Sequence, residues 1–63
     1  MFIVSKNKYS TGKRYRTSRD FTCAIGTIVA GSEVEIIGVS PGRGYDIRDI
    51  DSGFEMYEVG WAL

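Results

Sequence analysis

Few side chains in this 63-residue chain could carry out chemistry. It has one cysteine, Cys23, and no histidine, which excludes imidazole acid–base catalysis, histidine-based triads and histidine metal ligands. A thiol becomes a nucleophile only beside a group that can deprotonate it, and no such base is evident near Cys23. Because a free cysteine usually behaves as a small hydrophobic residue, we expect Cys23 to be a buried or half-buried structural thiol.

The closely spaced Asp46, Asp49 and Asp51 could hold calcium. However, Asp46 and Asp49 lie on an expected strand, and the turn lacks the twelve-residue ligand loop with its closing glutamate. A solvated strand face and a turn aspartate account for all three. Residues 41–44 (PGRG) are not a phosphate loop, because the Gly-Lys-Ser/Thr ending and the following helix are missing. We therefore expect no enzyme activity, no cofactor and no metal.

A basic N-terminal segment carries the strongest binding signal. Six Lys and Arg residues precede the first acid, Asp20, whereas two cations and eight acids occupy the remainder, so the two parts carry +6 and −6. This separation predicts either packing of the basic segment on an acidic sheet or a surface with two faces. Tyr9 and Tyr15 lie within the basic segment, and we expect these two rings and Tyr57 to be exposed.

Three interpretations of the basic segment stay open. It could hold phosphates while its rings stack on bases, although the zero net charge of the chain is unlike a dedicated nucleic-acid binder. It could be a solvated arm, or it could bind another protein or peptide, since Tyr and Arg are enriched at protein interfaces. The candidate partner-binding residues are Tyr9, Lys13, Arg14, Tyr15, Arg16, Arg19, Arg43 and Tyr57.

The elements that must position these residues are short strands. Between residues 28 and 61, apolar and polar residues alternate, and Gly-containing turns interrupt them about every eight to ten residues. A change of alternation at Ile37, followed by Gly38, predicts a β-bulge. Turns are expected at residues 40–44 and 51–53, and no helical periodicity is present. The chain is predicted to be all-β, with a core containing Val34, Ile36, Ile47 and Val59.

From about residue 15 to the C-terminus, the order of motifs resembles the bacterial SH3-like (SH3b) domain family. The corresponding stretches are YRTS at 15–18, IGTI at 25–28, VAGSEVEI at 29–36, GYDIR at 44–48, DSG at 51–53 and GW at 60–61. The resemblance implies a small SH3-like antiparallel barrel of about five short strands, and binding of cell-wall peptides. Residues 1–13 have no counterpart in the family, and we expect an added edge strand and a basic loop there.

The cysteine count also bears on the compartment. A single cysteine excludes an internal disulfide and fits a reducing cytoplasm. The apolar stretch MFIV at residues 1–4 is too short for a signal peptide or a membrane span. We therefore predict one cytoplasmic SH3-like domain over residues 1–63, not associated with membranes, that binds another protein without catalysis. In size and composition it is like a small phage or prophage accessory protein. Binding of nucleic acid or of cell-wall peptides is the alternative.

Overall fold

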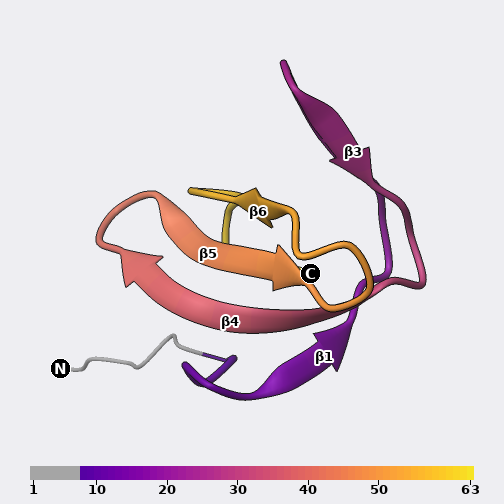
Figure 1. The fold of residues 1–63 in the computed structure, drawn as a ribbon. Coiled ribbons are helices and arrows are strands. Elements are labelled where there is room, and N and C mark those ends of the chain that lie inside the picture. Colours follow the sequence, from indigo (N-terminus) through magenta and orange to yellow (C-terminus); the bar gives the residue numbers. More distant parts are fainter. Residues whose placement is uncertain (1–7) are drawn as a thin grey trace, which may run out of the picture.

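The computed structural model describes residues 8–63, which form strands and turns without a helix. Four strands make one antiparallel sheet in the order β1-β4-β5-β6, and two make a separate hairpin, β2–β3 (Figure 1). The strand bounds are β1 (Arg14–Arg16), β2 (Phe21–Cys23), β3 (Gly26–Ile28), β4 (Glu33–Ser40), β5 (Gly44–Asp49) and β6 (Glu55–Met56). The all-β prediction is confirmed, with six strands in place of about five.

The predicted edge strand near the N-terminus falls largely on residues 1–7, which lie outside the described part. Residues 8–13 contain no strand and turn back on themselves. The Lys13 N–H donates to the Ser10 carbonyl at 3.1 Å, and Gly12 supplies the positive φ of 87° that this turn requires. The basic loop expected here is therefore a tight turn leading into β1.

The β4–β5 hairpin is the longest pairing in the sheet, and Figure 1 shows both strands curving together. Its register shifts between Ile36 and Gly38, so Ile36 lies opposite Ile47 while Gly38 lies opposite Asp46. This confirms the β-bulge expected where the apolar alternation changes. A bulge bends the strand it interrupts, which fits the curvature of β4. The turn predicted at 51–53 is also present, with Gly53 at a φ of 78°.

The core lies on one face of the four-stranded sheet. Val34, Ile36 and Ile47 are fully buried as predicted, and Val59 is half-buried against them. Tyr45 is also fully buried despite its hydroxyl, which accepts a hydrogen bond from the backbone N–H of Tyr9 at 3.2 Å. The remaining buried apolar side chains are Phe21, Ile28, Met56 and Leu63. Two of these, Phe21 and Ile28, face each other across the base of the β2–β3 hairpin and join it to the core.

Residues 57–63 were expected to alternate as a strand, but they form none beyond a single bridge between Gly44 and Gly60. Glu58 interrupts the extended backbone with a positive φ of 57°. The segment stays beside β5 because the Val59 N–H donates to the Tyr45 carbonyl and the Tyr45 N–H donates to the Gly60 carbonyl, both at 2.9 Å. A Cβ atom on Gly44 would lie 2.3 Å from the Gly60 oxygen, so only glycine permits this approach.

Candidate functional site

The basic N-terminal segment packs on the acidic sheet. Strand β1 pairs with β4 so that Arg14 lies directly opposite Glu35. Glu35 also accepts a hydrogen bond from Arg48 at 2.9 Å, and Arg48 lies 3.8 Å from Glu55. Cations and anions therefore alternate across the four strands, from Arg14 on β1 to Glu55 on β6. Of the two interpretations of the charge separation, the structure favours packing of the basic segment on acidic strands.

The other predicted arginines are also engaged within the protein. Arg16 lies opposite Glu33 and donates from Nη1 to the Gly31 carbonyl at 2.6 Å. Arg43 forms an ion pair with Glu58 at 3.3 Å. Lys13 is exposed and makes no ion pair with any residue from 8 to 63. The eight predicted residues thus do not form a single unpaired basic surface.

Tyr9 and Tyr15 were predicted to be exposed, and this is wrong because both are half-buried. Their rings meet edge to face at 4.8 Å, and Tyr9 meets the buried Tyr45 ring in the same way at 5.3 Å. The Tyr15 hydroxyl accepts a hydrogen bond from the Ser10 N–H at 2.9 Å. These rings cover the end of the core where Tyr45 lies. Trp61 packs on the other side of Tyr45 at 5.3 Å and is 43% exposed.

Arg19 and Tyr57 lie together at a groove between β2 and the segment that follows β6. The groove has a volume of about 260 Å³. In Figure 1, β3 projects beyond the four-stranded sheet. Its partner in the hairpin, β2, contributes residues to the lining of the groove. The groove is lined by Arg19, Asp20, Phe21, Thr22, Cys23, Met56, Tyr57, Glu58 and Val59.

The groove combines apolar side chains with an open strand edge. Phe21 and Met56 are buried, Val59 is half-buried, and Tyr57 is 58% exposed. Thr22 pairs with Thr27, and this pair is the middle one of the three residue pairs in the β2–β3 hairpin. In a two-residue hairpin this middle pair is the non-hydrogen-bonded one, so the N–H and C=O of Thr22 point away from β3. The free edge of β2 therefore presents one backbone donor and one acceptor.

Arg19 joins the two walls of the groove. Its guanidinium lies 4.1 Å from the centre of the Phe21 ring, in the geometry of a cation–π contact. Its Nη2 atom donates to the Val59 carbonyl at 3.1 Å and to the Ala62 carbonyl at 2.9 Å. The Arg19 side chain, which the sequence placed in a basic arm, therefore contacts both β2 and the C-terminal segment.

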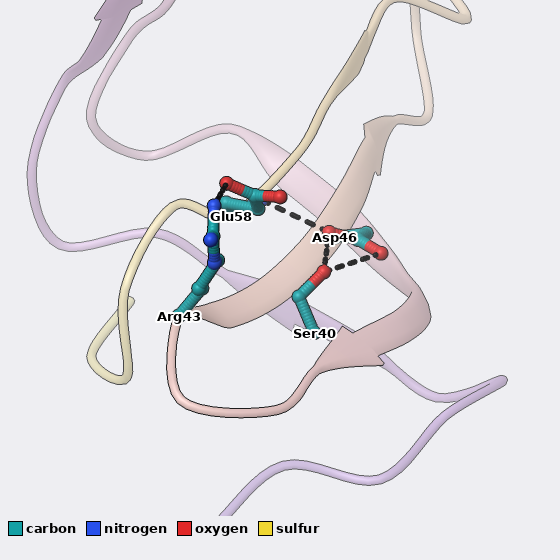
Figure 2. A network of polar contacts seen from close by, with 4 residues as sticks. All are labelled: Ser40, Arg43, Asp46 and Glu58. Carbon is teal, nitrogen blue, oxygen red and sulfur yellow. Dashed lines mark hydrogen bonds and ion pairs between the residues drawn. The ribbon is translucent and has the colours of Figure 1, made fainter.

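A polar network supports the wall formed by residues 57–59 (Figure 2). The Asp46 carboxylate lies between Ser40 and Glu58, accepting the Ser40 hydroxyl at 3.1 Å and the Glu58 N–H at 2.9 Å. The Glu58 side chain points toward Arg43. Because a non-glycine residue with positive φ is strained, these contacts are what hold Glu58 in its conformation. The network connects the 41–43 turn, β5 and the groove wall.

Tyr57 stands at the groove rim with its hydroxyl donating to Glu55. This hydrogen bond, together with the negative charge of Glu55, raises the pKa of Tyr57 above its ordinary value of 10.0. The phenol is therefore neutral at physiological pH and offers a polar tip on an apolar ring. The prediction that Tyr57 is exposed is confirmed.

Cys23 was predicted to be buried or half-buried, and the structure shows it exposed at the rim of the groove. It lies on the same face of β2 as the buried Phe21, but two residues farther out, where the hairpin extends past the core. Sequence reasoning also missed Phe21, Thr22 and Glu58 as site residues. No local pattern marks them, because the groove forms only when segments more than 30 residues apart meet.

Other kinds of site find no support in the described part of the chain. Residues 8–63 contain no group of three or more histidine, cysteine, aspartate or glutamate side chains arranged to hold a metal ion. The same residues include no helix of the length and apolar character that crossing a membrane requires. Comparisons with protein-family models, with curated proteins and with solved structures find no match to this chain.

Proposed function

We propose that this protein is a non-catalytic, SH3-like binding module that holds an extended segment of another protein in the groove between β2 and residues 56–59. The observation that carries the proposal is the coincidence, in one groove, of buried apolar side chains, an exposed tyrosine and a free strand edge. Exposed Tyr beside apolar side chains is typical of peptide-binding surfaces.

The SH3-like part of the proposal has support from the strand order. Strands β4, β5 and β6 follow one another as antiparallel neighbours, and β1 returns to the other side of β4. The end of the chain comes back to the segment after β1, where the Ser18 N–H and hydroxyl both donate to the Leu63 carbonyl, at 2.6 and 2.9 Å. This contact between the end of the chain and the segment after β1 supports the small SH3-like barrel that the motif order implied.

An extended occupant fits the groove better than a small molecule. A volume of about 260 Å³ lies below the range of about 300–1,000 Å³ typical of small-molecule pockets. The groove is nevertheless large enough for one or two side chains of a strand passing through it. Extended peptides bind sheet edges by backbone hydrogen bonds and place alternate side chains in adjacent pockets, and Thr22 offers such an edge.

Nucleic-acid binding has less support. Arg14 and Arg16 lie opposite glutamates on β4, and Arg43 is paired with Glu58. Nucleic-acid binding gains affinity when Lys and Arg neutralise phosphates and release the counterions of the nucleic acid. Glutamates beside these arginines oppose the approach of phosphates, and Arg43 would also have to leave its ion pair. Tyr9 and Tyr15, the rings that would stack on bases, are engaged with Tyr45 and with each other.

A selection from a displayed library of random peptides tests the proposal. Immobilised, nuclease-treated protein is used as bait, and the selected peptides are measured against Tyr57→Ala and, as a matched control, Ile25→Ala. Ile25 is also exposed and apolar, at 79%, but it does not line the groove. We expect Tyr57→Ala to weaken binding at least about tenfold, a loss typical of an interface hot spot, and Ile25→Ala to leave it unchanged.

Two results would overturn the proposal. The first is that selected peptides bind both variants as well as the wild type. The second is that no peptide is selected, while a random single-stranded oligonucleotide binds with a steep salt dependence that Arg14→Glu with Arg16→Glu abolishes. That outcome would instead establish the basic segment as a nucleic-acid site.

A further inference from the structure

We infer that the groove selects partner segments that carry a carboxylate, received by Arg19, two residues from a large apolar side chain that packs beside Phe21. This inference rests on the proposed function and names the chemical class of its ligand. It follows from how Arg19 is held and from which of its hydrogen-bond donors are used.

Arg19, like Arg16, makes its close polar contacts with backbone carbonyls, in contrast to Arg43 and Arg48. Arg43 and Arg48 are each paired with glutamate, whereas no carboxylate from residues 8–63 lies within 4.0 Å of the Arg19 guanidinium. Its two hydrogen bonds go to neutral backbone carbonyls, both from Nη2. An arginine has five N–H donors, so those on Nη1 and Nε remain for a ligand. A full positive charge with open donors therefore faces the groove.

The two carboxylates that line the groove are already occupied. Asp20 is next to Arg19 in the chain, but its Oδ1 accepts the Ala30 N–H at 2.7 Å. Glu58 is directed to Arg43 by their ion pair. Neither is paired with Arg19, so no carboxylate of the groove lining neutralises this guanidinium.

Arg19 is also fixed in place before any ligand arrives. Stacking on Phe21 and hydrogen bonding to Val59 and Ala62 restrict a side chain that otherwise has many rotamers. A ligand then does not have to order it, which removes a common entropic cost of binding. A planar guanidinium matches a carboxylate through charge-assisted hydrogen bonds, and these are among the stronger polar contacts in proteins.

The position of the apolar side chain follows from strand geometry. Arg19 precedes β2 in a bend, and its guanidinium lies 4.1 Å from the centre of the Phe21 ring at the start of β2. In an extended ligand on the free edge of β2, alternate side chains project from the same face about 7 Å apart. A carboxylate at Arg19 thus places the side chain two positions away over Phe21, Met56 and Tyr57.

Two blocked pentapeptides, Ac-Thr-Glu-Thr-Leu-Thr-amide and its Glu-to-Gln counterpart, test the inference. Each is titrated into isotope-labelled protein while backbone and arginine side-chain resonances are followed by NMR. We expect the Glu peptide to bind at least about tenfold more tightly, a difference of about 1.4 kcal/mol. Its shifts should include the Arg19 Nε–H and lie in residues 19–23 and 56–59. The preference should decrease as salt is added.

Variants then assign the preference to one residue. In Arg19→Gln the Glu and Gln peptides should bind equally, whereas Arg16→Gln should retain the full preference. Arg16 is the matched control because it is exposed and also donates to a backbone carbonyl, but lies outside the groove. If Arg19→Gln does not fold, the Arg19 resonance shifts and the salt dependence of the wild type decide the question.

The outcomes separate the inference from the proposed function. Equal binding of the two peptides in the groove of the wild type, or a preference that survives in Arg19→Gln, overturns carboxylate selection and leaves peptide binding intact. Absence of groove shifts up to about 10 mM with either peptide overturns the inference. The proposed function also fails in that case if no peptide selected from the library shifts the groove resonances.

Discussion

The four-stranded sheet and the β2–β3 hairpin use the same kind of structure for different purposes. All four fully buried large side chains, Val34, Ile36, Tyr45 and Ile47, belong to β4 and β5 of the sheet. The hairpin buries only the pair at its base and exposes Ile25 at its tip. Stability therefore resides in the sheet, while the hairpin is left with free edges and exposed side chains.

The physical reason is the number of strands. A two-stranded hairpin with three residues in each strand cannot bury enough apolar surface to be stable alone. It persists because Phe21 and Ile28 are part of the core, and because Arg19 and Ser18 hold its first arm against the C-terminal segment. Substitutions in the sheet core should therefore lower the free energy of unfolding more than substitutions at the tip of the hairpin.

The largest effect is expected from truncating the sheet core. Ile36→Ala removes a fully buried side chain and leaves a cavity, so the free energy of unfolding should decrease by about 2–5 kcal/mol. In so small a domain this could abolish folding. Ile25→Ala, at the hairpin tip, should change it by about 0.5 kcal/mol or less. Denaturant unfolding of both variants measures the contrast, and equal losses would show that the tip is part of the core.

Gly44 and Gly42 offer a second contrast, within one turn. Both have positive φ, but a Cβ on Gly44 would collide with the backbone of Gly60, whereas nothing lies within 4 Å of a Cβ on Gly42. Gly42→Ala should lose about 1 kcal/mol to strain, and Gly44→Ala about 1–3 kcal/mol more. Thermal unfolding tests this, and similar melting temperatures for the two variants would mean that the contact of residues 57–63 with β5 is dispensable.

The polar network behind the groove should give an intermediate effect. Asp46→Ala leaves the Ser40 hydroxyl and the Glu58 N–H without their acceptor, which should cost about 1–3 kcal/mol and accelerate hydrogen exchange at Glu58. Asp51→Ala is the control, since Asp51 is exposed and its side chain makes no hydrogen bond with residues 8–63. Unchanged exchange at Glu58 in Asp46→Ala would show that the groove wall does not depend on this carboxylate.

The smallest effect concerns Tyr57 at the groove rim. The Glu55 hydrogen bond raises the pKa of Tyr57 in the folded state, so the folded state binds the phenol proton more tightly than the unfolded state. The associated stabilisation is complete below the unfolded pKa near 10 and is lost as the pH rises through the folded pKa. Glu55→Gln should lower the pKa of Tyr57 toward 10.0 in an NMR titration of the ring. A pKa that does not move would exclude Glu55 as the cause.

Local features of the fold could be predicted from neighbouring residues. The alternation around Val34, Ile36 and Ile47 located the sheet core, and the change at Ile37 located the bulge at Gly38. The turns expected at residues 40–44 and 51–53 are present, and Gly44 and Gly53 have positive φ there. These predictions succeeded because strand faces, bulges and tight turns depend on residues within two or three positions of one another.

The candidate site could be predicted only in part. Arg19, Arg43 and Tyr57 were identified, and all three lie at the groove or at the network behind it. Tyr9 and Tyr15 were assigned to the same surface, yet they cover the core around Tyr45. An aromatic residue in a polar segment looks exposed in the sequence, and only the return of the chain to Tyr45 buries it.

The sequence by itself determined that this chain forms strands, where the turns at residues 40–44 and 51–53 fall, and which side chains of β4 and β5 alternate into a core. The tertiary structure alone decided that Arg14 and Arg16 lie opposite glutamates of β4, that Cys23 is exposed, and that Arg19 contacts the C-terminal segment beside a groove. The reason is distance along the chain. Strand preference and turn chemistry act over a few residues, whereas charge pairing, burial and grooves depend on which distant segments meet.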